Sequence, residues 1–178
     1  MRASHLYTAS VPLLKGLAYR TGVLDLNDNP GFAFVALDAD SPVHNIAWQT
    51  SLALLDDIVD EVDACGARFT LVMFPVETQL SEAALRMYRD GLGVHITESA
   101  MAGGPQQRVQ AWADARGVDM VDLLGEFRSA DPAKGSLYLR NDAVAIDPVH
   151  LSPRGNAVAA AAIAEHLAAD PPAMALVE

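Results

Sequence analysis

The stretch RFTLVMFP, residues 68–75, is a compact apolar run that ends at a proline, and it is the clearest strand signal in the chain. Its length and continuity are typical of a strand buried on both faces of a parallel sheet. Directly before it, residues 42–66 predict one long amphipathic helix, because apolar side chains recur there at steps of three and four residues. A serine–proline pair opens this helix and a glycine closes it.

The rest of the chain alternates predicted helices and strands in the same way. We expect helices over residues 81–91, 105–116 and 155–167, and strands over 94–97 and 118–123. Nearer the N-terminus, a loose helical pattern covers residues 4–20, and an irregular connection with one short strand at 32–37 covers residues 22–42. Such alternation predicts an α/β fold with a mainly parallel sheet, in which function gathers beyond the carboxyl ends of the strands.

Length and charge restrict the classes of function. The 178 residues suffice for one domain, which we place at residues 1–170, with 171–178 as a C-terminal tail. A net charge of −11 would repel nucleic-acid backbones and anionic membranes, so neither is a predicted partner. No window reaches the roughly 18 apolar residues of a membrane span. As written, the N-terminus lacks the features of a signal peptide, so we expect a cytoplasmic protein.

Several other features have ordinary structural interpretations. Cys65 is the only cysteine, which excludes an intramolecular disulfide, and we expect it to lie buried in a helix. We interpret the carboxylate run at 56–63 as a solvated helix face. Residues 25–31 begin like a calcium-binding loop, but we interpret them as a turn. Trp48 and Trp112 fall in phase with the apolar faces of their predicted helices, so we assign them to the core. Four histidines are too scattered along the chain to predict a metal site, namely His5, His44, His95 and His166.

The stretch from Asp147 to Gly155, DPVHLSPRG, carries most of the functional information. It places an acid and an imidazole three residues apart, immediately before a predicted helix. In hydrolytic triads a histidine takes a proton from the nucleophile, while a carboxylate fixes its tautomer and stabilises the cation that forms. Asp147 and His150 are therefore candidate catalytic residues. Spacing alone leaves a second interpretation open, a capped turn with a solvated histidine.

From Val118 onward the chain closely resembles the end of the SGNH, or GDSL-type, hydrolases. In that family a strand ending in an aspartate–leucine pair, like Asp122-Leu123 here, leads through a loop to a D-x-x-H block. A proline- and glycine-containing helix start and an alanine-rich last helix then follow, as they do after His150. Upstream, residues 48–66 and 68–75 resemble the family's penultimate helix–strand unit.

The resemblance implies a three-layer, flavodoxin-like α/β domain with a mainly parallel sheet, of which we expect the N-terminal strands to be missing. It also implies hydrolysis of a small-molecule carboxylic ester through an acyl-serine intermediate. His150 would act as general base and then acid, and Asp147 would orient it. Neither a metal nor an organic cofactor is implied, and nothing selects one ester over another.

The serine that this pair would serve is the point of departure from the family. There it lies in an N-terminal Gly-Asp-Ser block, followed by a Gly-x-Asn-Asp block, and this sequence contains neither. The Asn27-Asp28 pair has too little chain before it to be the latter block, and we interpret it as a turn. We therefore expect a chain that carries only the His/Asp part of the triad and is inactive alone. The alternative is a non-catalytic α/β module whose exposed sheet edge binds a protein partner.

Overall fold

The computed structural model describes residues 17–18, 21, 23, 42–91, 96–139 and 150–169. Several features predicted from the sequence lie wholly outside these residues, namely the short strand at 32–37, the turns at 25–31 and 27–28, the candidate catalytic Asp147 and the tail at 171–178. Most of the helical pattern at 4–20 lies outside them as well.

Two parallel strands form the centre of the described structure. Strand β1 (Thr70–Met73) pairs with β2 (Asp119–Asp122) in a register that sets Thr70 opposite Asp119 and Met73 opposite Asp122. Helix α3 (Pro42–Ala64) precedes β1 and helix α6 (Gly104–Arg116) precedes β2, as the sequence predicts. The two strands are shorter than the predicted runs at 68–75 and 118–123 but lie within them.

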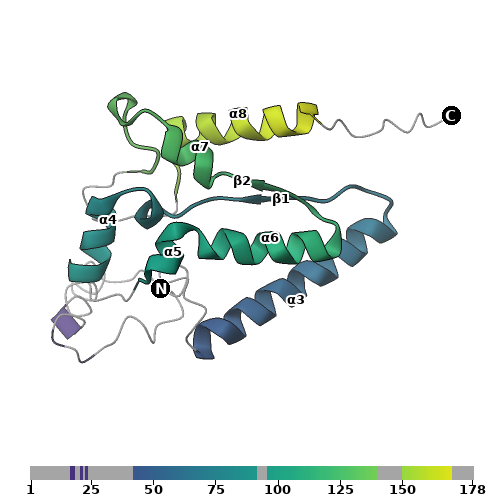
Figure 1. Cartoon of the computed structure of the whole chain (residues 1–178), viewed down its shortest axis with the longest axis horizontal. Helices are drawn as coiled ribbons and strands as arrows, with labels where there is room; N and C mark the ends of the chain where they lie inside the picture. Colours follow the sequence, from purple (N-terminus) through teal and green to yellow (C-terminus); the bar gives the residue numbers. More distant parts are fainter. Residues whose placement is uncertain are drawn as a thin grey trace, which may run out of the picture.

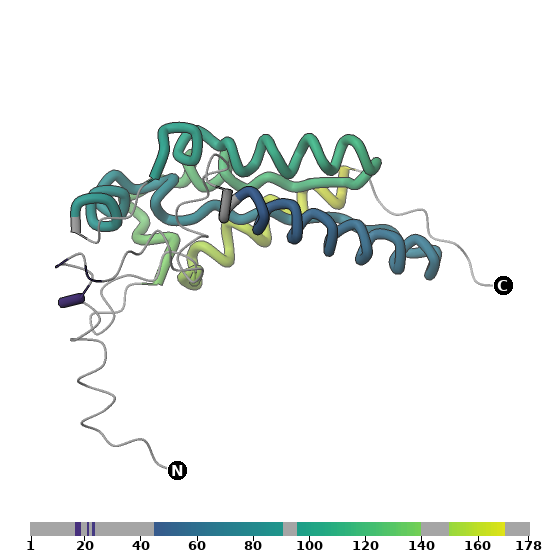
Figure 2. Tube along the Cα trace, turned by 90° about the horizontal axis from the view of Figure 1, so that it is seen from below, coloured from purple at the N-terminus to yellow at the C-terminus, as the bar shows by residue number. Residues whose placement is uncertain are grey.

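Helices cover the two strands from both sides. In Figure 1, α3 and α6 lie on one side of the strands, and α7 (Leu124–Ser129) and α8 (Pro153–Ala169) lie on the other. Figure 2 shows the same arrangement from below, with α8 passing behind α3. This layering of helices on a parallel sheet confirms the predicted α/β class. No helix within the described ranges is both long and apolar enough to cross a membrane.

Helix α3 is attached to α6 by polar contacts as well as by packing. The indole N–H of Trp112 donates to a carboxylate oxygen of Asp56 at 3.0 Å, and Arg116 forms ion pairs with Asp56 and Asp60. The guanidinium of Arg108 stacks over the ring of Trp48, 5.4 Å from its centroid. The carboxylate run at 56–63 is therefore partly engaged, and the tryptophans lie half-buried at a helix–helix interface instead of in the enclosed core.

Two expectations about burial are wrong. Cys65 is exposed and lies just after α3 ends, because the chain turns there through Gly66, whose φ of +67° favours glycine. All the residues of β1 are half-buried, whereas the apolar run predicted a strand enclosed on both faces. A strand is enclosed on both faces only where other elements cover it, and the apolar run at 68–75 does not by itself specify those elements.

The connection from β1 to α6 is more helical than expected. It contains a 3₁₀ turn η2 (Glu77–Gln79), helix α4 (Glu82–Arg86), a π-helical turn η3 (Met87–Gly91) and helix α5 (Glu98–Ala102). The predicted strand at 94–97 is wrong at its described residues, because the Thr97 hydroxyl accepts the Ala100 N–H and caps α5. Gln79 and Gln106 exchange two buried amide hydrogen bonds of 3.0 Å, which join η2 to α6.

One cluster of the hydrophobic core lies between the sheet, α7 and α8. Its buried members come from β2, the residue that follows it, α7, the segment before residue 140 and α8: Val121, Leu123, Phe127, Tyr138 and Ala159. Half-buried apolar side chains surround them, namely Val72, Leu80, Leu137, Leu151, Val158, Ala162 and Ile163. This core holds the last helix, and the residues just before that helix, against the end of the sheet.

Candidate active site

His150 lies at the start of a short antiparallel ladder that joins residues 150–152 to residues 136–139. Tyr138 and Leu151 form its bridge, and the Leu139 N–H donates to the His150 carbonyl at 2.8 Å. Farther along, the Ser152 N–H donates to the Leu137 carbonyl at 2.9 Å. The backbone of His150 is therefore fixed by a neighbouring segment, while the residue itself is exposed.

The ladder is anchored beyond the carboxyl end of the sheet. The buried hydroxyl of Tyr138 donates to the carbonyl of Pro75, which follows the end of β1 by two residues. At the same end, the Leu123 N–H that follows β2 donates to the carbonyl of Met73. His150 is therefore attached to the edge of the sheet where α/β proteins of this type place their functional loops.

The start of α8 holds the ladder from its other side. The Ser152 hydroxyl donates to the Ser136 carbonyl at 2.7 Å and accepts the Gly155 N–H at 3.1 Å. Pro153 opens the helix, so the cap and first-turn proline expected from the sequence are confirmed. Gly155 has no room for a side chain, because a Cβ there would lie 2.1 Å from the carbonyl oxygen of Leu137.

The structure describes the position of His150. Its predicted acidic partner, Asp147, lies outside the described residues. The assignment of the two residues as an acid–base pair accordingly stays a prediction. Within the described ranges, no three histidine, cysteine, aspartate or glutamate side chains converge into a group that could hold a metal ion.

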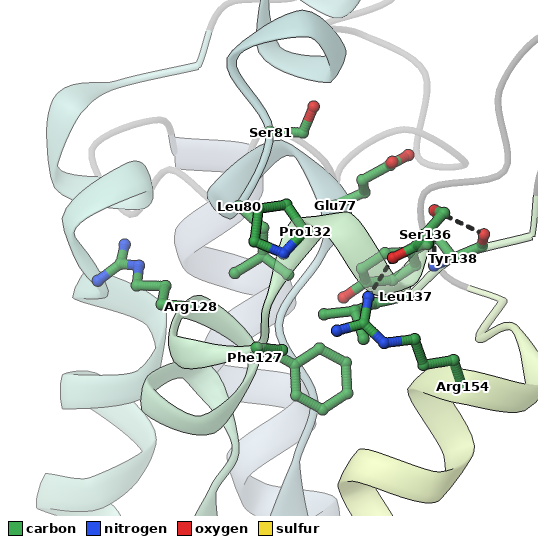
Figure 3. A pocket seen from close by; sticks show the side chains of 12 residues that line it. Glu77, Leu80, Ser81, Phe127, Arg128, Pro132, Ser136, Leu137, Tyr138 and Arg154 are labelled. Carbon is green, nitrogen blue, oxygen red and sulfur yellow. Dashed lines mark hydrogen bonds between the residues drawn. The ribbon is translucent and has the colours of Figure 1, made fainter.

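A cavity of about 480 Å³ opens beside the ladder. Its wall combines apolar side chains with hydroxyls, one acid and two arginines: Glu77, Leu80, Ser81, Phe127, Arg128, Ala130, Pro132, Gly135, Ser136, Leu137, Tyr138 and Arg154. Figure 3 shows Arg128 and Arg154 on opposite sides of it, with Leu80, Pro132 and Phe127 between them. Arg154 donates to the carbonyls of Gly135 and Asp131, and this attaches the loop after α7 to α8.

Two residues beside this cavity were not predicted from the sequence to belong to the site. Glu77 is only 4% exposed although it is charged, and Tyr138 is buried with its hydroxyl on Pro75. Burial raises the pKa of the Tyr138 phenol, and the nearby Glu77 carboxylate raises it further, so the phenol keeps its proton and acts as a donor. The available signal for Glu77 was its place directly after the predicted strand at 68–75.

The serine hydroxyls around the ladder and the cavity make bonds to backbone groups. Ser81 caps α4 by accepting the Ala84 N–H. Ser136 donates to the Tyr138 carbonyl and accepts its N–H, while Ser152 makes the bonds that hold the start of α8. A hydroxyl whose proton is directed at a carbonyl oxygen is not prepared for transfer to an imidazole. Ser136 and Ser152, which donate to carbonyl oxygens, therefore have structural roles.

A second histidine–aspartate pair lies at the opposite end of the sheet. His166, in the last turns of α8, is 2.8 Å from a carboxylate oxygen of Asp119, the first residue of β2. The other oxygen of Asp119 accepts from Arg68 and Thr70, each at 3.0 Å. This pair holds the end of α8 on the amino edge of the strands, and sequence spacing gave no indication of it.

Replacing Asp119 by asparagine is expected to destabilise the domain at neutral pH, and this effect should shrink in acid. Although burial raises the pKa of Asp119, hydrogen bonds from His166, Thr70 and Arg68 outweigh it and hold the pKa below 3.8. Such a carboxylate contributes stability above about pH 4, and this contribution is lost as the pH falls through its folded-state pKa. Urea unfolding of both proteins from about pH 7 to about pH 3 measures the difference. A difference that stays constant on acidification would contradict the prediction.

The chain matches a known protein family over most of its length. Residues 36–178 match the family model of the SGNH hydrolase-like domain of the acetyltransferase AlgX. No curated protein and no solved structure matches the chain. The match includes every strand and helix described from α3 to α8, together with the D-x-x-H stretch. The chain therefore belongs to the AlgX family of SGNH hydrolase-like domains.

Proposed function

We propose that this domain supplies the acid–base half of a site that cleaves carboxylic esters through an acyl-serine intermediate. His150 takes the proton of a serine hydroxyl as its oxygen attacks the ester carbonyl, and then returns the proton to the leaving alkoxide. Asp147 orients the imidazole and stabilises its protonated form. Deacylation repeats the cycle, with His150 taking a proton from the hydroxyl that accepts the acyl group.

The observation that carries this proposal is the attachment of His150 to the carboxyl end of the sheet. The Leu139 N–H fixes the backbone of His150, and the neighbouring Tyr138 is bonded to Pro75 just beyond β1. Membership of the AlgX family adds support, because its model is described as an SGNH hydrolase-like domain of an acetyltransferase. An alcohol in place of water as acyl acceptor would make the same site a transferase, with His150 in the same role.

The isolated chain is expected to lack this activity. An acid–base pair needs a nucleophile and donors for the developing oxyanion, and losing the donors alone costs about 10²–10³ in rate. The serine hydroxyls of Ser81, Ser136 and Ser152 are engaged with backbone groups, and the sequence has no Gly-Asp-Ser block. Hydrolysis of a small-molecule ester therefore requires a nucleophilic serine that these residues do not provide.

We expect the purified chain to form no covalent adduct with a fluorophosphonate probe, and to hydrolyse p-nitrophenyl acetate no faster than the buffer. The probe bonds stably only to an activated serine, so intact-mass spectrometry separates triad chemistry from weak catalysis by exposed imidazoles. His150→Ala is the matched control. An adduct that forms on the chain and disappears in His150→Ala would show that a serine of this chain serves His150, which would overturn the expected inactivity.

A further inference from the structure

Tyr138 connects two parts of the molecule that are far apart in sequence. Its side chain is 2% exposed, and its hydroxyl reaches the carbonyl of Pro75, sixty-three residues away along the chain. Its backbone lies in the ladder opposite Leu151, the residue after His150. One side chain thus links the end of β1 to the segment that presents His150.

The contacts around Tyr138 leave its backbone little freedom to shift. Ser136 closes a tight turn by bonding both the N–H and the carbonyl of Tyr138, at 3.2 and 2.9 Å. The aromatic ring meets Phe127 of α7 edge to face, with centroids 6.3 Å apart and planes at 60°. The next residue, Leu139, donates directly to the His150 carbonyl. The path from Pro75 to His150 therefore runs through Tyr138 and one peptide bond.

We propose that Tyr138 is a positioning residue for His150: the hydrogen bond from its phenol to Pro75 sets the height of His150 above the carboxyl end of the sheet. The catalytic meaning of this placement rests on the proposed function, since a general base must come within hydrogen-bond reach of its nucleophile. The placement itself does not depend on turnover. It acts on the backbone of His150 through the neighbouring Leu139.

Tyr138→Phe tests this role, because it keeps the ring and its contact with Phe127 and removes only the hydroxyl. We expect amide exchange at Leu139 to accelerate about tenfold, since a buried hydrogen bond that supports the ladder is lost. The imidazole resonances of His150 should shift in the same variant. The Leu123 amide, bonded to Met73 at the sheet end, and the ring of His166 should not change.

Tyr88→Phe is the matched control, because Tyr88 is equally buried but lies outside the ladder. Unchanged Leu139 exchange and His150 resonances in Tyr138→Phe, or equal changes in Tyr88→Phe, would overturn the proposal. If Tyr138→Phe does not fold, Ser136→Ala removes the turn that holds the backbone of Tyr138 and should move the same two readouts in the same direction. A fluorophosphonate adduct would contradict the proposed inactivity of the chain and leave these readouts unaffected, so the two failures are distinguishable.

Discussion

Replacing Gly155 by alanine is expected to destabilise the domain by about 3 kcal/mol, the upper end of the cost of overpacking. The new Cβ would lie 2.1 Å from the Leu137 carbonyl oxygen and 3.1 Å from its carbon. Both atoms belong to the backbone, and that oxygen already accepts the Ser152 N–H. The clash can be relieved only by moving α8 away from the ladder that holds His150. Such a loss is a large part of a total stability of about 5–15 kcal/mol.

Gly125→Ala is the matched control, because nothing lies within 4 Å of a Cβ built at Gly125 in α7. It should be neutral, or stabilising by up to about 1 kcal/mol. Urea unfolding of the two variants beside the wild type gives both values. A Gly155→Ala protein that fails to fold beside a folded Gly125→Ala protein agrees with the prediction. Equal stability of the two variants would show that the start of α8 does not pack on Leu137 as described.

Truncating Phe127 to alanine is expected to cost about 3–5 kcal/mol, the range for removing a buried aromatic side chain. Phe127 is 2% exposed and belongs to the core cluster with Val121, Leu123, Tyr138 and Ala159. Its loss removes the edge-to-face contact with Tyr138 and opens a cavity between the sheet and α8. The site should loosen together with the core, because Tyr138 holds the His150 ladder.

Phe74→Ala makes the same chemical change at a side chain that is 45% exposed. Since little area is lost there, it should cost about 1 kcal/mol. Thermal and urea unfolding compare the two truncations, and Phe127→Leu replaces Phe127→Ala if the larger truncation does not fold. Similar losses from Phe127 and Phe74 would contradict the placement of Phe127 in a buried cluster between the sheet and α8.

The sequence predicted the elements whose signals are local. The run at 68–75 contains β1, the amphipathic pattern at 42–66 contains α3, and the glycine at 117 ends α6. Ser152 and Pro153 marked the start of α8 correctly, because a capping hydroxyl and a first-turn proline act within one turn of helix. The resemblance to the SGNH hydrolases, drawn chiefly from the D-x-x-H stretch, is confirmed by the family match over residues 36–178.

Other features depend on contacts between distant residues and left no periodic signal. Helix α5 and the π-helical turn η3 are only one turn long, too short for a hydrophobic pattern. The Tyr138 bond to Pro75 and the pair of His166 with Asp119 each join segments more than forty residues apart. The burial of Cys65 was mispredicted for a related reason. The apolar pattern placed Cys65 inside the helix, but the helix ends at Ala64 and Cys65 is exposed.

The candidate site was predicted in part. The stretch around His150 was identified from the sequence, and the structure adds the ladder that attaches it to the end of β1. Tyr138 was missed because its burial depends on the segment before residue 140 packing against Pro75 and Phe127. Nothing local in the sequence marked Glu77 as a buried residue. The pairing of His150 with Asp147, which lies outside the described residues, stays a prediction.

The most direct test of that pairing is an NMR search for imidazole N–H protons held in hydrogen bonds to carboxylates. We expect one from His150. It should be absent in Asp147→Asn and retained in Asp142→Asn, which neutralises an acid five residues earlier in the chain. His166 provides an internal reference, because its contact with Asp119 at 2.8 Å should give a second such proton that only Asp119→Asn removes. A His150 proton that is missing in the wild type while that of His166 is present, or one that persists in Asp147→Asn, would contradict the acid–base pair and favour a non-catalytic α/β module.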